Sequence, residues 1–558
     1  MSSFLLLRAL CCTLSFAAAA YEPTWESLDA RPLPDWYDDV KFGVFITWGP
    51  YSVPAHGNEW YLQRLLTGAD DNATRIWHQK TYGPNFSYAD FGPLYKAELW
   101  DPNEWAQLFL EAGIKFTIFT AKFCDGWTHW KAASKWNWNS VDNGPSRDIV
   151  GEFSAAIKAA GIHLGFYYCN IEWGNPLLPW DYEHGPEPYE GQETYVNEVF
   201  LQELKDLTVK YEPDLINGDY CVLLNSSQLK SPDFLAWLYN ESPVKDRVIV
   251  NDRWGTDCRC KHGGYWTCRD KFQPTAPVGH KWTDLMTMAG SWGWDRLETD
   301  ANYKSANELI TLLVNNVALG GNLALNVGPR ADGKIPLIMM ERLRAIGAWL
   351  KINGEAIYNT TMWRNFTETA LTESFRVYAG MSNIDSKPPA PGKSAATVLY
   401  LGQTNTSDAC AQLCVAANFT TKYGKPCLSF TWQANDCPQP QWSSTCYGET
   451  DTDWEPAVEP GHTTGTRLLT IYYTAAKREP GTVYAIAIGT LPSQTTLSLR
   501  LPKPSKGTQV AFLTGGGSVP VEWSGEAATA GMEIHLSSSM LLASSESAAS
   551  VFKMTGIA

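Results

Sequence analysis

Beyond its first twenty residues the sequence has no apolar run near the ~20 residues that a membrane-spanning helix needs. It shows no internal repeat, no glycine-rich loop ending in GK[ST] and no His/Asp cluster with metal-ligand spacing, so we expect no cofactor and no metal. Positive charge is scarce as well, with 44 Lys and Arg against 59 Asp and Glu and a formal net charge of −15. Phosphate backbones bind to basic surfaces, so nucleic acid is not expected as a partner.

Aromatic side chains, by contrast, are abundant, with 25 Trp and 25 Tyr. Most of them taken singly fill hydrophobic cores, but flat rings also pack well against the apolar faces of sugars. As a group they favour a carbohydrate ligand.

The N-terminus indicates a secretory route. Residues 1–20 resemble a signal peptide, with a short apolar stretch followed by small residues. Of the 13 cysteines, Cys11 and Cys12 leave with it, so at least one of the rest is unpaired or pairs between chains. Asn-X-Ser/Thr sequons begin at Asn72, Asn85, Asn225, Asn240, Asn359, Asn365, Asn405 and Asn418. We therefore expect the protein to be secreted or held in a lysosomal or vacuolar lumen.

Residues 21–360 alternate β-like apolar runs with amphipathic helical stretches, which predicts a (β/α)₈-type barrel. The strands expected are Phe42–Trp48, Phe116–Ala121, Leu164–Cys169, Asp214–Asp219, Arg247–Asp252, Gly264–Cys268 and Asn322–Gly328. The helices expected include Asn103–Ala112, Asp148–Ala160, Gln192–Tyr211 and Ile335–Ile352. The fold class is thus α/β, and the chain is long enough for further domains.

After the barrel the pattern changes to short alternating strands, which predicts a C-terminal β-sandwich over residues 361–380 and 466–558. Residues 381–465 interrupt it with five cysteines, Cys410, Cys414, Cys427, Cys437 and Cys446. A small disulfide-rich insert is the natural interpretation, and zinc is a weaker one because an oxidising route would pair such thiols.

A lone carboxylate, Asp219, ends the apolar run in YEPDLINGDY, and a second polar block, VNDRWG (Val250–Gly255), ends the next run. Barrel enzymes carry their catalytic groups at the carboxyl ends of strands. This placement points to a hydrolase that works with carboxylates, and Asp219 is its first candidate.

Taken together, several ordered blocks resemble the α-L-fucosidases of glycoside hydrolase family 29. They include KFGVFITWGPYSVPAHGNEWY, WDPNEWAQLFLEAGIKFTIFTAKFCDG, YEPDLINGDY, VNDRWG, SWGWDR and ALGGNLALNVGPRADGKIP. The stretch CRCKHGGYWTCRDKFQP (Cys258–Pro274) is most similar to the animal lysosomal branch. The resemblance implies a retaining hydrolase that releases terminal α-L-fucose from glycoconjugates.

The resemblance also implies site residues. Retention needs a nucleophile and an acid/base about 5–5.5 Å apart; Asp219 matches the nucleophile, and Asp270 is our choice of acid/base, with Asp284 as the alternative. The matching sugar contacts are Glu59, Trp60, Tyr167, Arg253 and Trp292. For Arg253 the competing interpretation is an ion pair with Asp252 or Asp219 that merely orders the barrel rim. For Asp270 it is an ion pair with Arg269, Lys271 or another arginine.

Three positions depart from the family pattern, because Thr47, Phe123 and Cys124 stand where histidines usually contact the sugar. Each hydroxyl left unsatisfied costs roughly 1–3 kcal/mol of binding. Two alternatives stay open. The enzyme has an altered sugar specificity, or it is a catalytically weak relative that binds glycans.

The insert resembles a PAN/apple-type module, which implies a glycan or protein ligand, although an inert stapled loop fits nearly as well. The partners expected are therefore fucosylated glycans and this ligand. A homo-oligomer is left open.

Overall fold

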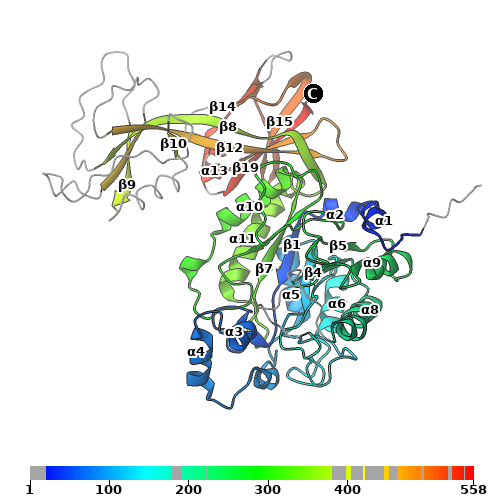
Figure 1. Cartoon of the computed structure of the whole chain (residues 1–558). Coiled ribbons are helices and arrows are strands. Elements are labelled where there is room, and N and C mark those ends of the chain that lie inside the picture. The colour runs from blue at the N-terminus through cyan, green and yellow to red at the C-terminus, as the bar shows by residue number, and fades with distance from the viewer. Residues whose placement is uncertain are drawn as a thin grey trace, which may run out of the picture.

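A computed structural model describes residues 20–178, 191–219, 223–379, 397–403, 419–421, 445–450, 462–488, 491, 496–525, 531–545 and 547–557. Within them the chain forms a helix-covered parallel sheet, and antiparallel sheets pack against one end of it (Figure 1). The expected signal peptide lies outside these residues except for Ala20. So does most of the expected insert, including Cys410, Cys414, Cys427 and Cys437.

Seven parallel strands make the first sheet, in the order β5-β4-β3-β2-β1-β7-β6. Their bounds are β1 Phe42–Ile46, β2 Phe116–Lys122, β3 Gly165–Cys169, β4 Leu215–Asp219, β5 Ile249–Val250, β6 Thr283–Thr287 and β7 Asn322–Val327. Almost every strand residue is buried, as expected where helices cover the outer face of a parallel sheet. The predicted barrel-type α/β fold is confirmed.

The closure of the ring differs from the prediction. Gly264–Cys268 was expected to be a strand and is not one; β6, Thr283–Thr287, is the strand that the sequence pattern did not predict. The segment still lies in the barrel wall, since the Gly264 amide donates to the Val250 carbonyl (3.0 Å) and the Trp266 amide to the Lys281 carbonyl (2.8 Å). Gly263 (φ 93°) allows this approach, because a Cβ there would lie 2.2 Å from the Asn251 carbonyl oxygen.

Helices connect the strands and cover the barrel. The bounds are α1 Trp25–Asp29, α2 Asp35–Asp39, α3 Tyr61–Thr67, α4 Ala73–Tyr82, α5 Pro102–Glu111, α6 Ile149–Ala159, α7 Gln192–Thr194, α8 Leu201–Tyr211, α9 Ser231–Asn240, α10 Ala306–Ala318 and α11 Leu337–Asn353. A π-helical segment, Tyr195–Phe200, joins α7 to α8. Local signals explain several starts: Asp101 caps α5 ahead of Pro102, and Ser305 and Glu308 form a capping box on α10.

The C-terminal part is antiparallel. Nine strands form one sheet, β8 Thr360–Ala379, β9 Thr397–Gln403, β10 Phe419–Thr421, β11 Thr445–Thr450, β12 His462–Ala476, β13 Val483–Ile488, β15 Pro504–Thr514, β16 Gly517–Val521 and β19 Ala549–Ile557. Three form a second, β14 Thr496–Leu499, β17 Trp523–Ser524 and β18 Met532–His535. Side chains of both sheets share one hydrophobic cluster, so the two sheets pack as a sandwich. A short helix, α13 Ser538–Ser545, follows β18.

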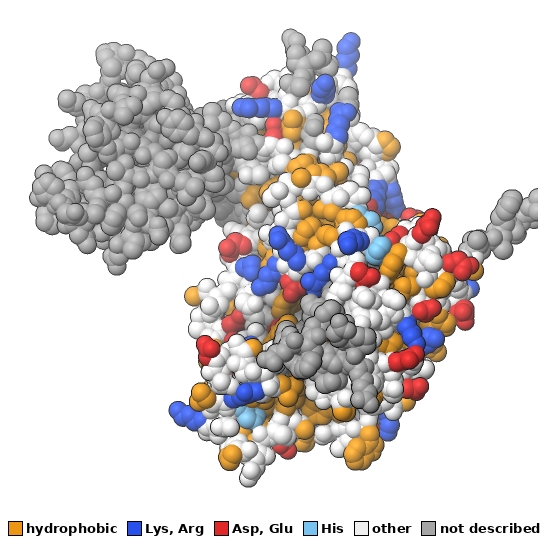
Figure 2. Space-filling view, in the orientation of Figure 1, with side chains coloured by type: hydrophobic (Ala, Val, Ile, Leu, Met, Phe, Trp, Pro, Cys, Tyr) orange, Lys and Arg blue, Asp and Glu red, His pale blue; other side chains and the backbone are white. Residues whose placement is uncertain are grey.

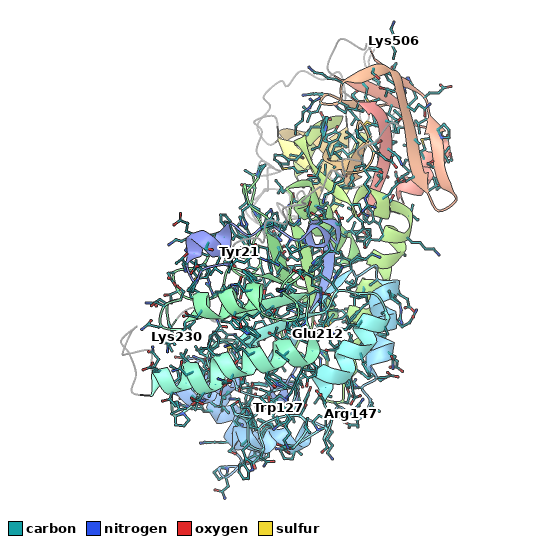
Figure 3. All side chains as sticks on the ribbon, turned by 90° about the vertical axis from the view of Figure 1, so that its right-hand side faces the viewer. Tyr21, Trp127, Arg147, Glu212, Lys230 and Lys506 are labelled. Atoms are coloured by element: carbon teal, nitrogen blue, oxygen red, sulfur yellow. A yellow bond between two sulfur atoms is a disulfide. The ribbon has the colours of Figure 1, made fainter. Side chains whose placement is uncertain are left out.

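The sandwich is docked on the barrel end opposite the strands' carboxyl ends. The Trp349 indole of α11 donates to the Ala549 carbonyl (3.0 Å), and Tyr484 and Val551 belong to the same hydrophobic cluster as the barrel core. In Figure 3, Trp127, which follows β2, lies at the end of the molecule far from Lys506 of the sandwich. The carboxyl edge of the barrel is therefore free of the sandwich.

The surface carries both signs of charge. On the face shown in Figure 2, acidic and basic side chains are interspersed over the described residues. None of the helices in the described part of the chain combines the length and the apolar character that crossing a bilayer requires.

Four charged side chains are buried beside the carboxyl ends of β2 and β3. The Lys122 ammonium lies 2.9 Å from a Glu172 carboxylate oxygen and 3.0 Å from one of Glu203, and Lys135 also pairs with both glutamates. Burial alone would favour the neutral forms, but the two lysines lower the pKa of Glu172 and the glutamates raise that of Lys135. The network ties β2 to the loop after β3 and to α8.

We expect Lys122→Met to lower the free energy of unfolding by about 3–5 kcal/mol, because it leaves two buried carboxylates facing one lysine. Urea unfolding of the purified protein measures this. Lys131→Met is the matched control, since the Lys131 side chain is 65% exposed and pairs with Asp142 at the surface, where a pair contributes about 0–1 kcal/mol. Equal small losses in the two variants would contradict the prediction.

Candidate active site

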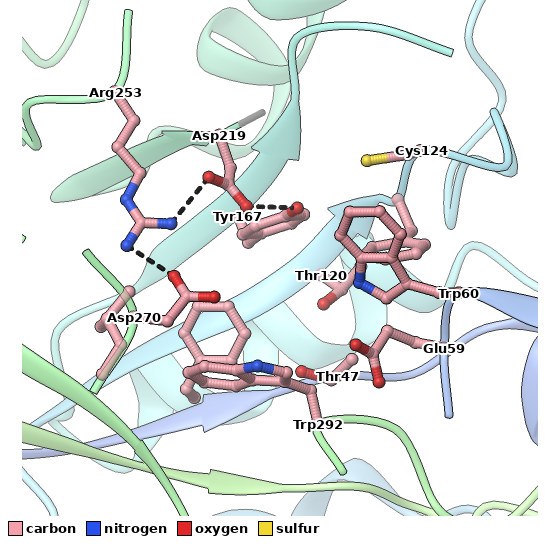
Figure 4. Close-up of a pocket in the computed structure, with 13 residues that line it drawn as sticks. Thr47, Glu59, Trp60, Thr120, Cys124, Tyr167, Asp219, Arg253, Asp270 and Trp292 are labelled. Carbon is pink, nitrogen blue, oxygen red and sulfur yellow. Dashed lines mark hydrogen bonds and ion pairs between the residues drawn. The ribbon is translucent and has the colours of Figure 1, made fainter. Parts of the chain in front are cut away.

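A pocket of about 500 Å³, measured with its open mouth, lies at the carboxyl edge of the barrel (Figure 4). Successive strands contribute to it: Phe45 from β1, Thr120 from β2, Tyr167 from β3, Asp219 from β4 and Leu285 from β6. This edge is where barrel enzymes place their reactive groups.

The structure brings ten of the sequence-predicted site residues into this pocket, all except the alternative acid/base Asp284. They are Thr47, Glu59, Trp60, Phe123, Cys124, Tyr167, Asp219, Arg253, Asp270 and Trp292. Three further lining residues were not predicted, Phe45, Thr120 and Leu285. Apolar and hydroxyl residues inside strands resemble ordinary core, so only the inward alternation of a correctly placed strand would have found them.

Arg253 joins the two carboxylates that matter most. Its Nη1 lies 2.9 Å from Oδ1 of Asp219, and its Nη2 lies 2.7 Å from Oδ1 of Asp270. The guanidinium is buried, with its side chain 4% exposed, whereas the side chain of Asp219 is 19% exposed and that of Asp270 is 54% exposed. One carboxylate thus lies at the pocket wall and the other at its mouth, and both contact the same cation (Figure 4).

Asp219 owes its position to strand alternation. In β4 the side chains of Asn217 and Asp219 point into the barrel, because residues two apart lie on the same face. Lower in the barrel the Asn217 amide oxygen accepts from the Tyr265 hydroxyl (2.9 Å), and at the top Oδ2 of Asp219 accepts from the Tyr167 hydroxyl (2.9 Å). Burial, and then the Asp219 charge, hold the pKa of Tyr167 well above its usual range, so Tyr167 remains a donor.

A third carboxyl group, Glu59, lies on the other side of the pocket. It is buried, and it accepts from the Gly293 amide (3.0 Å) and the Ser291 hydroxyl (3.4 Å). Burial raises the pKa of Glu59, and the bond from Gly293 works against that rise. The loop that carries Gly293 also places Trp292, whose ring packs edge-on against Phe45 (5.4 Å between centroids).

The wall of the pocket formed by Phe123 and Cys124 is apolar, whereas the family resemblance predicts histidines at these positions. Phe123 packs edge-on against Tyr51 (5.2 Å) and Trp173 (5.5 Å). Cys124 forms a disulfide with Cys169, which links the ends of β2 and β3. Neither side chain donates a hydrogen bond, so a sugar hydroxyl that faces this wall has no partner on it.

The pocket's hydroxyl groups are already engaged. Thr47 donates to the Asn326 side chain (2.7 Å) and Thr120 donates to the Ile46 carbonyl (2.6 Å). Since each hydroxyl has only one hydrogen, these threonines meet a ligand as acceptors. Thr47, at the position where the family resemblance predicts a histidine, therefore offers a ligand an acceptor but not a donor.

Asp284, the alternative acid/base, lies outside the pocket. It is on β6 next to Leu285, and the alternation that points Leu285 inward turns Asp284 outward against α10. Its Oδ2 accepts from the Asn316 amide (3.2 Å), and its side chain is buried. The structure therefore does not bring Asp284 together with Asp219, and this alternative is dropped.

One group of potential metal ligands occurs among the described residues, Asp252, Cys260 and Cys268. The two sulfurs are bonded to each other as a disulfide, and both carboxylate oxygens of Asp252 accept amide hydrogens. A divalent cation needs deprotonated thiols and free carboxylate lone pairs. The donor set does not fit a metal.

Comparisons with known proteins point to a single family. A family model described as alpha-L-fucosidase matches residues 9–355. The chain is 44% identical over 401 residues to the alpha-L-fucosidase of Dictyostelium discoideum, covering 68% of this chain and 86% of that protein. It is 46% identical over 345 residues to the tissue alpha-L-fucosidase of Homo sapiens, covering 62% and 73%. A crystal structure of Thermotoga maritima alpha-fucosidase in complex with fucose superposes with a TM-score of 0.66 at 26% identity, covering 96% of this chain and 100% of that one.

Asp284 offers a pH-dependent test of its placement. Burial raises its pKa to about 6, although Asn316 lowers it in part, whereas the unfolded value is about 3.9. The stability that this raised pKa contributes is present below about pH 4 and is lost as the pH rises through 6. Asp284→Asn lacks this loss, so its unfolding free energy relative to the wild type should rise by about 3 kcal/mol between pH 4 and pH 7. Denaturant titrations at the two pH values measure it, and a flat difference would place the carboxyl in water.

Proposed function

The chain belongs to the α-L-fucosidase family of glycoside hydrolases, and on that premise we propose which of its residues carry out the reaction. The proposed reaction is hydrolysis of terminal α-L-fucose from glycoconjugates with retention at the anomeric carbon. The observation that carries the assignment is the Arg253 guanidinium, which contacts Asp219 on one side and Asp270 on the other.

In the first step Asp219 attacks the anomeric carbon of the fucoside and the bond to the glycosidic oxygen breaks. Asp270 gives its proton to that oxygen, so the aglycone leaves as an alcohol and a fucosyl ester forms on Asp219. Tyr167 and Arg253 donate to Asp219 from two sides and orient its attacking oxygen. Orientation of this kind supplies a large part of an enzyme's rate.

In the second step Asp270, now a carboxylate, takes a proton from a water molecule, which attacks the anomeric carbon and releases Asp219. The half-exposed position of Asp270 at the mouth supports this role, since both the aglycone and the water arrive from that side. Two displacements at one carbon give retention.

Sugar binding falls to the opposite side of the pocket. Glu59 and the Thr47 and Thr120 hydroxyls offer acceptors for sugar hydroxyls, while Trp60, Trp292 and Phe45 offer flat apolar surface for the ring and its methyl group. The wall at Phe123 and Cys124 gives no donor, so we propose that binding rests on hydroxyls that the substrate donates.

Several broader proposals rest on the sequence. We infer that the protein is secreted or lumenal, which the disulfides Cys124–Cys169 and Cys260–Cys268 support because such bonds persist in oxidising compartments. The domain boundaries at residues 20, 360, 380 and 466, a glycan or protein ligand for the 381–465 insert, and a homo-oligomer stay predictions.

The nucleophile is tested by hydrolysis of an aryl α-L-fucoside at pH 4–7. We expect Asp219→Asn to lower kcat/KM by at least ~10³-fold, because it removes the attacking group and no neighbour replaces it. A 2-deoxy-2-fluoro fucoside should leave a covalent adduct on the wild-type peptide that contains residue 219, seen by mass spectrometry. Asp142→Asn, at a surface ion pair, is the control. A wild type with neither turnover nor adduct would instead favour a glycan-binding protein.

The acid/base is tested by the leaving group and by azide. Asp270→Asn should reduce kcat/KM by ~10²–10⁴-fold for a fucoside of a poor leaving group, but only slightly for a dinitrophenyl fucoside, whose leaving group needs no proton. With the dinitrophenyl fucoside, azide should restore turnover of Asp270→Asn and yield fucosyl azide, because azide attacks the fucosyl ester without a general base. Asp284→Asn should behave like the wild type in both assays. If Asp284→Asn showed the leaving-group dependence and Asp270→Asn did not, the assignment would be reversed.

A further inference from the structure

Asp252 immediately precedes Arg253, lies outside the pocket and is fully buried. Its carboxylate accepts four hydrogen bonds. Oδ1 accepts from the amide (2.9 Å) and the hydroxyl (2.7 Å) of Thr267, and Oδ2 accepts from the amides of Cys260 and Cys268, each at 2.9 Å. The Cys260–Cys268 disulfide closes the same loop. One side chain thus holds both ends of the loop that leads into Asp270.

The backbone around Asp270 needs such an anchor. Cys260 (φ 55°), Cys268 (φ 51°) and Lys271 (φ 53°) all adopt the left-handed conformation without being glycine. Residues of this kind persist only where the surroundings hold them in place. Asp270 lies between two of them, and the next amide, of Lys271, donates to the Leu285 carbonyl on β6 (3.1 Å). Asp270 is therefore held from the Asp252 side and from β6.

The same carboxylate also acts on Arg253 through Thr267. The Thr267 hydroxyl gives its hydrogen to Asp252, so a lone pair is left to accept from Nε of Arg253 at 2.7 Å. A guanidinium is planar, and fixing Nε fixes the directions of Nη1 and Nη2. Those two nitrogens are the ones that contact Asp219 and Asp270.

We propose that Asp252 is a positioning residue that places Asp270 for proton transfer and, through Thr267, aims Arg253 at both carboxylates. The inference rests on the proposed function, in which Asp270 is the acid/base. It predicts that a change at Asp252, a residue that touches no substrate, weakens general acid catalysis in particular rather than the enzyme in general.

The experiment compares kcat/KM of Asp252→Asn for two aryl α-L-fucosides, one with a poor leaving group and one with a dinitrophenyl group. The amide offers hydrogens at one of the two positions where the carboxylate offered lone pairs. Its NH2 group therefore faces either the amides of Cys260 and Cys268 or the amide and hydroxyl of Thr267. A displacement near 1 Å costs ~10²-fold in a reaction that depends on geometry. We expect a ~10²-fold loss with the poor leaving group and less than ~5-fold with the good one.

Two further variants keep the test decisive. Asp257→Asn is the matched control, because Asp257 lies on the same segment but accepts from the amide and hydroxyl of Ser226 and touches neither Thr267 nor Arg253. Thr267→Val removes the hydroxyl that joins Asp252 to Arg253 and spares the amides of Thr267, Cys260 and Cys268, so it serves if Asp252→Asn does not fold. It should show a smaller loss, about tenfold, with the same leaving-group dependence.

The outcomes separate cleanly when Asp270→Asn is assayed beside these variants. Leaving-group dependence in Asp252→Asn, in the absence of any in Asp257→Asn, supports the inference. Equal losses for both substrates, in step with a lower melting temperature, would overturn it and leave Asp252 as a purely structural anchor. If Asp270→Asn itself lacked the dependence, the proposed acid/base would fail instead, whatever Asp252 does.

Discussion

The guanidinium that Asp219 and Asp270 share is the contact on which the rest of the site depends. A guanidinium cation carries several N–H donors in one plane, so it can hold two carboxyl groups in fixed directions at once. Arg253 supplies that cation from the end of β5, while Asp219 comes from β4 and Asp270 from a loop in the barrel wall. The three side chains meet only because parallel strands bring their carboxyl ends to one edge. The fold brings the two acids to one edge of the barrel, and Arg253 holds them there as neighbours with different exposure to solvent.

How much of this could be predicted from sequence depends on whether the signal is local. Asp219 ends a run of apolar residues, so the ten-residue stretch YEPDLINGDY is enough to predict that it lies at a strand end, where the structure places it. Gly264–Cys268 shows an equally good strand pattern, but on the β6 side its backbone forms a single isolated bridge, between Trp266 and Trp282. At its end, Cys268 is held by the disulfide to Cys260 and by Asp252 instead. The sequence pattern also missed β6. Asp284, the second residue of this strand, resembles a functional residue, and only its contact with Asn316 of α10 shows that it faces outward.

Cysteine pairing is a second limit. Cys124 and Cys169 are 45 residues apart, and the residues around each cysteine do not predict which cysteine it pairs with. Only the adjacency of β2 and β3 brings them together. The family resemblance predicts a histidine at position 124, so from sequence alone Cys124 indicates a missing sugar contact and nothing more. In the structure its sulfur is a covalent link that makes the wall rigid and apolar, and a thiol or a histidine could not do both.

Buried charged side chains lie next to the apolar wall formed by Phe123 and Cys124. Lys122 precedes Phe123 in sequence, and Glu172 lies near Cys124 because the amide of the next residue, Trp173, donates to the Cys124 carbonyl (2.6 Å). Lys122 and Glu172 form an ion pair with each other, and they also pair with Glu203 and Lys135 respectively. The hydroxyls of Thr47, Thr120 and Tyr167 likewise give their hydrogens to protein acceptors. These pocket side chains are therefore rigid before a ligand arrives, and they present lone pairs and ring faces. A hydroxyl group of a ligand that meets one of these three side chains therefore donates the hydrogen bond.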